Sequence, residues 1–497
     1  MQNITLFQFF HWYYPDDGSL WKHCAEQAAY LKKLGVTYVW LPPATKSANG
    51  MHEPGYAVYD LFDLGEFDQK GSIPTKYGTK NDFINCIKVL HEEGVKVLAD
   101  VVLNHKTGAD EKELVKAKEV DSNDRTKLSE REEAVEAYTK FTFPGRKGKY
   151  SNFIWDWHCF TGFSNTSNEG TKIYSILNEY GQDWEEVIDN EFGNYDYLMG
   201  SDIEFRNEHV REELKYWGRW FLETTGVDGF RLDAVKHISP RFMKEWVNHM
   251  KGTKDNLFFL AEYVTGDVNK LIAWYHAVDD QVQLFDVVLH DNLYKASLEE
   301  KYDLRKILDN TLISHLPHRA ISFVDSHDTQ PGQLLSSFVE FWFKPLANAI
   351  ILLREQGIPC IFYPGIYGAT YHEEIDGENV KVELAPVPAL REMMMVRHHL
   401  AYGQQRDYFD HPNVVGWTRA GTAENKHSGC AVLISNGEDG SKKMEMGEGH
   451  ARADFVDITG NFGEKITTDE KGLADFKVRS RSVSVWVRSE IAEMIKA

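Results

Sequence analysis

The chain has 497 residues, of which 42% are hydrophobic and 13% aromatic, so it can bury a large core and is too long for one small domain. Its formal net charge of −21 excludes binding of nucleic acid or an anionic membrane through overall charge. A neutral ligand such as a sugar, metal binding by carboxylates, or solubility alone remains compatible with this charge.

The cysteines and the N-terminal residues indicate the cellular compartment of the protein. The cysteines are odd in number and far apart, with no CxxC pair, which argues against a disulfide framework or a zinc site. The stretch from Met1 to Phe10 lacks the charged and long apolar regions of a signal peptide. No apolar run approaches the ~20 residues needed to span a membrane. We therefore expect a soluble, cytoplasmic protein, and a monomer.

Short strand-like runs alternate with longer helical stretches over most of the chain. The predicted strands are Thr5–Phe10, Val36–Leu41, Val95–Val102, Val227–Leu232, Leu257–Ala261, Phe285–Leu289, Ala320–Val324 and Pro359–Tyr363. Helical spacing predicts helices over Trp21–Leu34, Asn81–Glu93, near Val210–Thr225, after Pro240 and over Pro345–Gln356. Eight alternating units predict an α/β fold, a (β/α)₈ TIM barrel, with a doubly wound open sheet as the alternative.

Two segments depart from this alternation. Residues 105–209 contain a charged stretch, Asp110–Lys140, and an aromatic stretch, Tyr150–Phe163, and predict a subdomain inserted after the third strand. After residue 397, short strand-like runs are separated by Gly, Asn and Asp, which is typical of an all-β domain. We therefore predict a barrel over 1–104 and 210–397, an inserted subdomain over 105–209, and a C-terminal antiparallel β-sandwich over 398–497.

Polar side chains follow four of the predicted strands, where a (β/α)₈ barrel carries its active site. They are Asp100, Asn104 and His105 in ADVVLNH, then Arg231, Asp233, Lys236 and His237 in GFRLDAVKH, then Glu262 in FLAEY, and Asp325, His327 and Asp328 in FVDSHD. This set holds several carboxylates but no serine nucleophile elbow and no glycine-rich phosphate loop. The chemistry it indicates is glycoside hydrolysis, which needs one carboxylic acid and a second carboxylate as nucleophile or base.

These motifs, with FHWYYPDDG, WLPPA, GYAVYDLFDLGEFDQKGSIPTKYGTK and GNYDYLMGSDI, occur in the order and spacing of a known family. The chain resembles the α-amylase family of glycoside hydrolases over essentially its whole length, most closely the bacterial liquefying and cytoplasmic branch. The resemblance implies a retaining α-amylase, which cleaves α-1,4 bonds inside starch, glycogen or maltodextrins. By this resemblance, Asp233 matches the family's nucleophile, Glu262 its general acid/base and Asp328 its third catalytic carboxylate.

Two features of the sequence fit these roles. Arg231 lies two residues before Asp233, so both face one side of a strand, and the guanidinium should keep the nucleophile ionised. Glu262 follows the apolar residues Phe258 to Leu260, where desolvation should raise the pKa of an acid.

The resemblance also assigns the sugar contacts. His105 and His327 match the pair that binds the scissile glucose, Tyr56 the aromatic platform under it, and Lys236 and His237 residues on the leaving side. Taken singly, each position has a structural explanation: a helix cap for an Asp, a hydrogen-bonded core residue for a His, an ion pair for Arg231, packing for Tyr56. Their joint occurrence in one ordered set favours the functional interpretation.

The resemblance further implies one structural calcium ion. The matched ligands are Asn104, Asp196, Asp202 and the backbone carbonyl of His237, hard oxygen donors that suit Ca²⁺. The alternative is that the two Asp residues are solvated loop acids. Some relatives hold further metal ions, but here Glu204 and Arg206 stand where those relatives carry acids, and the segment Phe160–Asn165 lacks a matching Asp. We therefore expect one calcium ion without a metal cluster.

Three other functions remain as alternatives. Within the family, a transglycosylase or an exo-acting maltogenic or oligo-glucosidase would carry the same motifs. A catalytically dead sugar-binding protein on the same barrel would typically lack one of the three carboxylates, and all three are present. A metal-dependent barrel hydrolase would require an HxH pair after the first strand, but the segment FQFFHWYY contains His11 alone.

Overall fold

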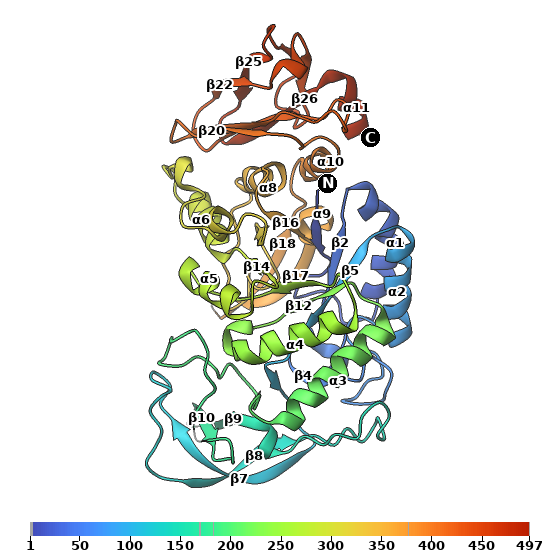
Figure 1. Ribbon diagram of the computed structural model, residues 1–497, viewed down its shortest axis with the longest axis vertical. Coiled ribbons are helices and arrows are strands. Elements are labelled where there is room, and N and C mark those ends of the chain that lie inside the picture. Colours follow the sequence, from blue (N-terminus) through green and yellow to red (C-terminus); the bar gives the residue numbers. More distant parts are fainter. Residues whose placement is uncertain (1–2, 168–169, 182, 376, 497) are drawn as a thin grey trace. The chain divides into compact units, whose positions relative to one another are not determined.

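The computed structural model describes residues 3–167, 170–181, 183–375 and 377–496, and in this part of the chain eight strands form a closed barrel (Figure 1). Neighbouring barrel strands pair in parallel wherever their register is defined. In barrel order the strands are β1 (Leu6–Gln8), β16 (Ile358–Phe362), β15 (Ala320–Phe323), β14 (Gln283–Phe285), β13 (Phe258–Ala261), β12 (Gly229–Leu232), β5 (Lys96–Val101) and β2 (Tyr38–Leu41). The predicted (β/α)₈ barrel is confirmed, and the open-sheet alternative is wrong.

Helices separate the barrel strands along the chain. They are α1 (Leu20–Lys33), α2 (Lys80–Glu92), α3 (Glu208–Thr225), α4 (Pro240–Thr253), α5 (Val268–Ala277), α6 (Val287–Leu298), α7 (Leu312–His315), α8 (Lys344–Leu353), α9 (Pro364–Tyr367) and α10 (Leu390–His399). Local chemistry fixes several ends. At α2, Thr79 and Asp82 form a capping box, and α3 ends at Gly226, whose φ of 74° is left-handed.

The predicted strand Phe285–Leu289 is wrong. The strand ends at Phe285, and the residues from Val287 onward form helix α6. Asp286 begins this helix, since its side chain accepts a hydrogen bond from the backbone N–H of Leu289 at 3.0 Å. A short apolar run does not distinguish a buried strand from a buried helix, and here the capping Asp decides between them.

By its internal contacts the chain divides into two compact units. One comprises Met1–Trp12, Ala29–Val39 and Phe285–Ala497, and the other Tyr13–Ala28 and Trp40–Leu284. This division does not follow the three predicted domains, whose boundaries stay predictions.

In the second unit, the segment between β5 and α3 contains a six-stranded sheet. Its strands, in order, are β6 (His105–Lys106), β11 (Ser201–Ile203), β9 (Phe160–Ser167), β10 (Gly170–Ile176), β7 (Glu111–Val120) and β8 (Glu133–Lys140). The pairing of β6 with β11 sets Asp202 opposite His105. It thereby joins the end of the insertion to the residues that directly follow β5.

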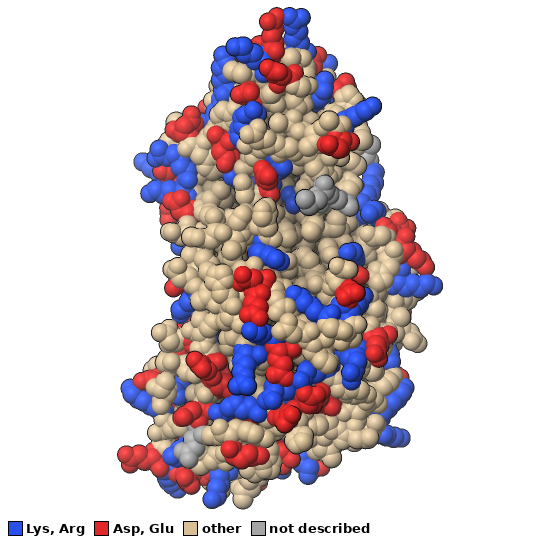
Figure 2. Space-filling view, in the orientation of Figure 1, with Lys and Arg blue, Asp and Glu red and all other residues tan. Residues whose placement is uncertain are grey.

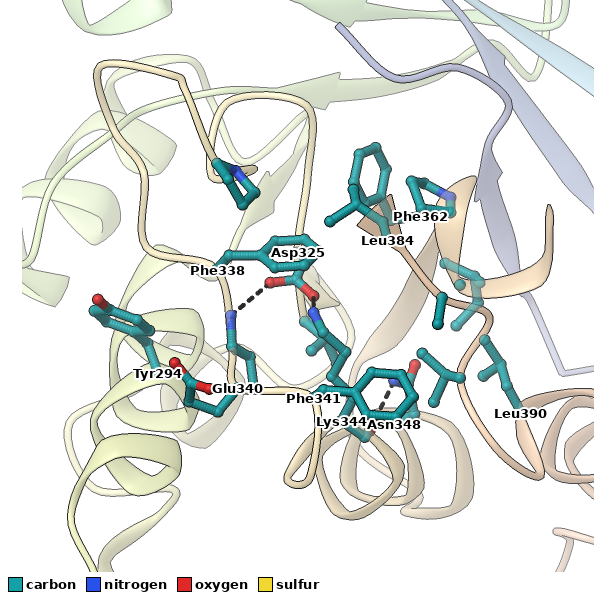
Figure 3. A pocket seen from close by; sticks show the side chains of 18 of the residues that line it. Tyr294, Asp325, Phe338, Glu340, Phe341, Lys344, Asn348, Phe362, Leu384 and Leu390 are labelled. Carbon is teal, nitrogen blue, oxygen red and sulfur yellow. Dashed lines mark hydrogen bonds and ion pairs between the residues drawn. The ribbon is translucent and has the colours of Figure 1, made fainter. Parts of the chain in front are cut away.

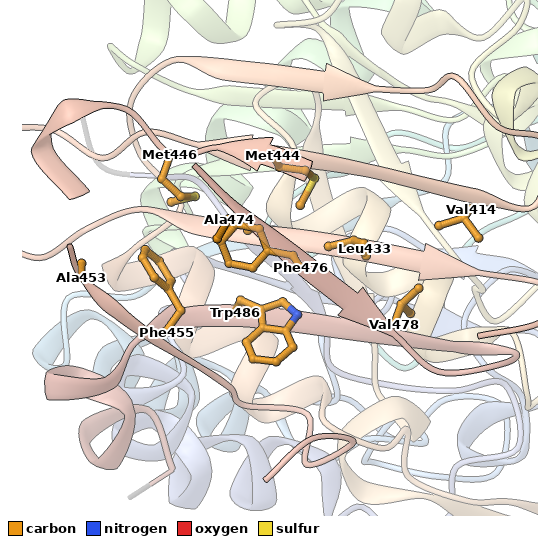
Figure 4. Close-up of a cluster of buried hydrophobic side chains, with 11 residues drawn as sticks. Val414, Leu433, Met444, Met446, Ala453, Phe455, Ala474, Phe476, Val478 and Trp486 are labelled. Carbon is orange, nitrogen blue, oxygen red and sulfur yellow. The ribbon is translucent and has the colours of Figure 1, made fainter. Parts of the chain in front are cut away.

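The C-terminal part of the first unit consists mainly of strands, with two 3-10 helices, Glu448–His450 and Ser489–Ile491, and a terminal helix, α11 (Ala492–Lys496). A six-stranded sheet has the order β19 (Gln405–Tyr408), β20 (Val414–Arg419), β21 (Cys430–Ser435), β26 (Ser482–Arg488), β23 (Asp454–Asp457) and β24 (Ile466–Thr467), and a two-stranded sheet pairs β22 (Gly440–Glu445) with β25 (Leu473–Val478). Apolar side chains of both sheets form one buried core, which includes Leu433, Phe455 and Trp486 from the first and Met444 and Phe476 from the second (Figure 4). The predicted all-β C-terminal domain is therefore confirmed.

Two small hairpins complete the fold, β3 (Lys46–Ser47) with β4 (Val58–Asp60) and β17 (Ala369–Ile375) with β18 (Glu378–Leu384). Throughout the described residues, every helix is too short or too polar to cross a bilayer. On the face shown in Figure 2, lysine and arginine side chains are interspersed with acidic ones.

Candidate active site

A single buried arginine organises the carboxylates. Arg231 lies on β12 with 1% of its surface exposed. Its guanidinium contacts Asp100 on β5 at 3.0 Å, Asp233 directly after β12, and Glu262 directly after β13 at 2.7 Å. Because one planar guanidinium serves all three side chains, the two predicted reactive carboxylates, Asp233 and Glu262, lie side by side.

The backbone after β12 adds a second link between Asp233 and Glu262. Ala234 has a left-handed φ of 50°, an uncommon conformation for a residue with a side chain. In this conformation its N–H donates to Oε2 of Glu262 at 3.0 Å. Strain of this kind, of order 1–3 kcal/mol, clusters at functional sites. Here the left-handed conformation of Ala234 holds the Glu262 carboxylate beside Asp233.

Asp100 anchors the arginine from the other side. Its carboxylate is buried and accepts hydrogen bonds from the hydroxyl of Tyr56 at 2.8 Å and from Nε1 of Trp40 at 3.1 Å. The bond to Asp100 also fixes the ring of Tyr56, the predicted sugar platform. His105 contributes to the same region, because its Nε2–H donates to the backbone carbonyl of Tyr56 at 3.0 Å.

Burial changes the protonation of these groups. It raises the pKa of Asp233 to about 8 and that of Asp100 to about 6, and the Arg231 guanidinium opposes both rises. Burial also lowers the pKa of His105 to about 4, so its imidazole is neutral at pH 7. Asp233 and Asp100 share the positive charge of Arg231, so this coupled pair retains a proton near neutral pH, and that proton belongs to the pair as a whole.

Asp328 and His327 follow β15 of the same barrel. Nδ1 of the buried His327 ring accepts a hydrogen bond from the side-chain Nε2–H of Gln8 at 3.0 Å. Its Nε2 lies 3.4 Å from Oδ2 of Asp328. The N–H of Asp328 bonds to Oγ of Ser326 at 3.2 Å. These contacts fix the predicted third carboxylate and the second predicted histidine relative to each other.

Lys236 and His237 lie in the short turn after Asp233. Lys236 pairs with Glu191 at 2.8 Å, and its ammonium lies over the ring of Tyr195. Asp189 is 3.6 Å from the same ammonium. The Nδ1–H of His237 donates to the carbonyl of Tyr195 at 2.6 Å, which ties this turn to the insertion.

Three of the four predicted metal ligands, Asn104, Asp196 and Asp202, lie close together where the insertion follows β5. Asn104 donates to Oδ1 of Asp202 at 3.3 Å, and its own Oδ1 is buried without a hydrogen-bond partner. Asp196 is buried, and Coulombic repulsion from Asp202 adds to burial in raising its pKa well above the usual range. Glu185, which the sequence did not suggest, is buried in the same cluster, and its pKa is raised by burial and by Asp196.

These acids and the unpaired amide oxygen fit a hard cation, although no group of three His, Cys, Asp or Glu side chains in the described residues is arranged as a ready metal site. Beside them, Arg206 binds the buried Glu204 in a bidentate manner, with Nη2–Oε2 at 2.6 Å and Nε–Oε1 at 2.7 Å. A fixed guanidinium therefore neutralises Glu204.

Comparison with known proteins accords with this geometry. The model of the α-amylase catalytic domain matches residues 17–392, and that of an α-amylase C-terminal domain matches residues 431–487. The chain belongs to the α-amylase family. It is 47% identical to the cytoplasmic α-amylase of Escherichia coli (strain K12) over 497 residues, covering 99% of this chain and 100% of that protein.

Other family members are also similar. A glucan 1,4-α-maltohexaosidase of Bacillus sp. (strain 707) is 42% identical, with 98% of this chain and 92% of that protein covered. Among solved structures, an α-amylase of Geobacillus thermoleovorans complexed with acarbose superimposes with a TM-score of 0.63 at 17% identity, covering 98% and 97% of the two chains. At that identity the likeness shows the α-amylase fold. As a family member the chain is a glycoside hydrolase.

Proposed function

We propose that this α-amylase family member cleaves α-1,4-glucosidic bonds within starch, glycogen and maltodextrins, with retention at the anomeric carbon. Asp233 attacks the anomeric carbon, while Glu262 protonates the glycosidic oxygen. Glu262 then deprotonates the water that releases the sugar from Asp233. Asp328 stabilises the positive charge that develops on the sugar ring.

The observation that carries this proposal is the sharing of Arg231 by Asp233 and Glu262. Retaining glycosidases place their two carboxyl groups about 5–5.5 Å apart, whereas inverting enzymes leave room for a water between them. Two carboxylates bound to one guanidinium, with one of them also held by the N–H next to the other, support the short separation.

The contact of Asp233 with Arg231 also supports its role. The first step needs Asp233 ionised. Arg231 contacts Asp233 directly and opposes the rise in its pKa that burial causes, so the guanidinium favours the ionised form of the nucleophile.

The product profile on soluble starch tests this function. Internal cleavage predicts an early fall in viscosity and mixed oligosaccharides, and ¹H NMR should show the α-anomer first. A relative of this chain is named a maltohexaosidase. Maltohexaose as the dominant early product would favour that specificity instead, and a first-formed β-anomer would overturn the retaining mechanism.

For the substrate contacts, we propose that Tyr56 lies under the scissile glucose, that His105 and His327 bind its hydroxyls, and that Lys236 and His237 hold the leaving side. The hydrogen bond from Nε2–H of His105 to the carbonyl of Tyr56 supports this proposal, because it fixes the imidazole next to the residue proposed as the platform. Lys236 is already paired with Glu191, so a substrate that binds Lys236 replaces this ion pair.

We also propose one structural calcium ion, held by Asn104, Asp196, Asp202 and the backbone carbonyl of His237. The orphaned Oδ1 of Asn104 and the mutually repelling buried acids support this donor set. When bound, the ion neutralises the acids and links the insertion to the barrel. The ion pair of Arg206 with Glu204 supports a single ion at this junction.

Removal of calcium should lower the melting temperature. An ion present at 100 times its dissociation constant contributes about 2.7 kcal/mol to the stability of the folded chain. We expect chelation to remove this contribution, calcium to restore it, and Asp202→Asn to abolish the response. Elemental analysis should find one calcium per chain. An unchanged melting temperature with no bound metal would contradict the site, and two ions per chain would contradict the single-ion assignment.

We further propose a cytoplasmic, monomeric enzyme. The name of the Escherichia coli relative and the five buried, unpaired cysteines of this chain support a reducing compartment.

A further inference from the structure

A cavity of about 520 Å³ lies in the unit that contains β15 and β16 (Figure 3). Its walls come from the segment between β15 and α8, from α8 itself, and from the residues around β18 and α10. None of the residues assigned above to catalysis, sugar contacts or calcium lines it. The cavity therefore shares no residue with the proposed active site.

A buried polar group forms the floor of the cavity. Asp325 and Lys344, with 6% and 4% exposure, form an ion pair, and the other oxygen of Asp325 accepts the N–H of Val339 at 2.9 Å. The ammonium of Lys344 also lies 3.3 Å from the centre of the Phe338 ring. Asn348, 5% exposed, lies one helical turn beyond Lys344. The two charges neutralise each other, so the floor offers polar atoms without net charge.

Aromatic rings and acidic side chains occupy the sides and the mouth. Figure 3 shows Tyr294 and Glu340 on one side and Phe362 on the other, with Phe341 at the front. Glu340 is exposed, and so is 47% of Phe341. Acids at the mouth disfavour an anionic ligand. Rings that pack on the C–H face of a pyranose, with carboxylate and amide acceptors for its hydroxyls, suit a neutral sugar.

We infer that this cavity is a second binding site for a short α-1,4-glucan, such as the enzyme's own products. The inference rests on the proposed function, which identifies glucans as the ligands this chain meets. The volume falls within the ~300–1,000 Å³ of small-molecule sites, and the lining has their usual composition of apolar walls with few, fixed polar groups.

The position of the site connects it to the proposed reaction. The segment from Asp325 to Phe341 forms one wall of the cavity and carries His327 and Asp328. This segment is held at Pro331, whose carbonyl accepts from Tyr371 Oη at 2.8 Å, and at Glu340, whose N–H bonds to Oγ of Ser297 at 3.1 Å. A glucan in the cavity adds contacts to the same segment and so stabilises the conformation in which Asp328 is held.

The test uses the full chain carrying Glu262→Gln, which prevents turnover, with maltotriose as the probe. Calorimetric titration should reveal two sites, and soaked crystals should show sugar density in both the cavity and the carboxylate cluster. Adding Phe341→Ala should weaken the second site about tenfold, because a stacking ring is lost. Adding Ser336→Trp should block it by filling the mouth.

Leu334→Ala is the matched control, because Leu334 is 99% exposed on the same segment and does not line the cavity. It should leave both sites unchanged. A single site in solution, or a second site that neither cavity variant affects, would overturn the inference. Failure of the proposed function is distinguishable, because it would appear as starch hydrolysis by the Glu262→Gln enzyme itself.

Discussion

Replacing Asp233 by Asn should reduce starch hydrolysis by about 10⁴- to 10⁶-fold, the loss typical of a removed reactive group in a hydrolase. The amide cannot form the covalent glycosyl-enzyme, whereas Arg231 keeps its contacts with Asp100 and Glu262. The fold should therefore survive, with an unchanged circular dichroism spectrum. Glu262→Gln should be comparably inactive on starch, because the leaving oxygen then receives no proton.

The pH dependence of stability gives a second readout of the buried position of Asp233. Burial raises the pKa of Asp233 from 3.8 to about 8 in the folded chain. Between those values the folded state retains a proton that the unfolded state has lost, so this group destabilises the fold increasingly as pH rises from about 4 to 8. Asp233→Asn removes the penalty. The melting temperature of the variant should rise relative to that of the wild type between pH 5 and pH 8.5. A variant whose melting temperature falls further below that of the wild type over this range would contradict this account.

Replacing Arg231 by Met should cost about 3–5 kcal/mol of stability at pH 7, as expected when a buried ion loses its partner. The reason is that Asp100, Asp233 and Glu262 all depend on this one guanidinium. Activity should be lost as well, since the two carboxylates lose their common anchor. Arg231→Lys should recover only part of both, because an ammonium lacks the planar fork.

Chemical denaturation checks this prediction, and its pH dependence gives a second readout. Lowering the pH protonates the unpaired carboxylates, so the deficit of Arg231→Met should shrink at pH 5. Arg305→Met is a suitable control, because Arg305 pairs with Asp303 at the surface and should matter little. Equal effects of the two substitutions would show that Arg231 does not have the organising role described here.

Much of the barrel could be predicted from the sequence because its strands are marked by patterns of neighbouring residues. Strands such as β12 and β13 are short apolar runs buried in the barrel, and the residue directly after each of them is a carboxylate. That rule placed Asp233 and Glu262 at strand ends, and the spacing of two residues put Arg231 on the same side as Asp233. The strand predicted over Phe285–Leu289 was wrong because the capping role of Asp286 was missed.

Other parts of the site depend on contacts that no local pattern encodes. Asp100 lies inside an apolar run, and its partnership with Arg231 comes from the pairing of β5 with β12. Glu185 lies in a loop without periodicity, and only the folded insertion brings it to Asp196. The left-handed conformation of Ala234 could not be predicted, because nothing in the sequence distinguishes this alanine from one with an ordinary backbone conformation.

The central claim is that Asp233 forms a covalent bond to the sugar, and trapping that intermediate tests it most directly. α-Maltosyl fluoride needs no acid to release fluoride, so Glu262→Gln should still be glycosylated, while loss of the base slows hydrolysis of the intermediate. Mass spectrometry should show one maltosyl group per chain, attached to the peptide that contains Asp233. A label on another residue, or a product released with inverted configuration, would contradict the mechanism.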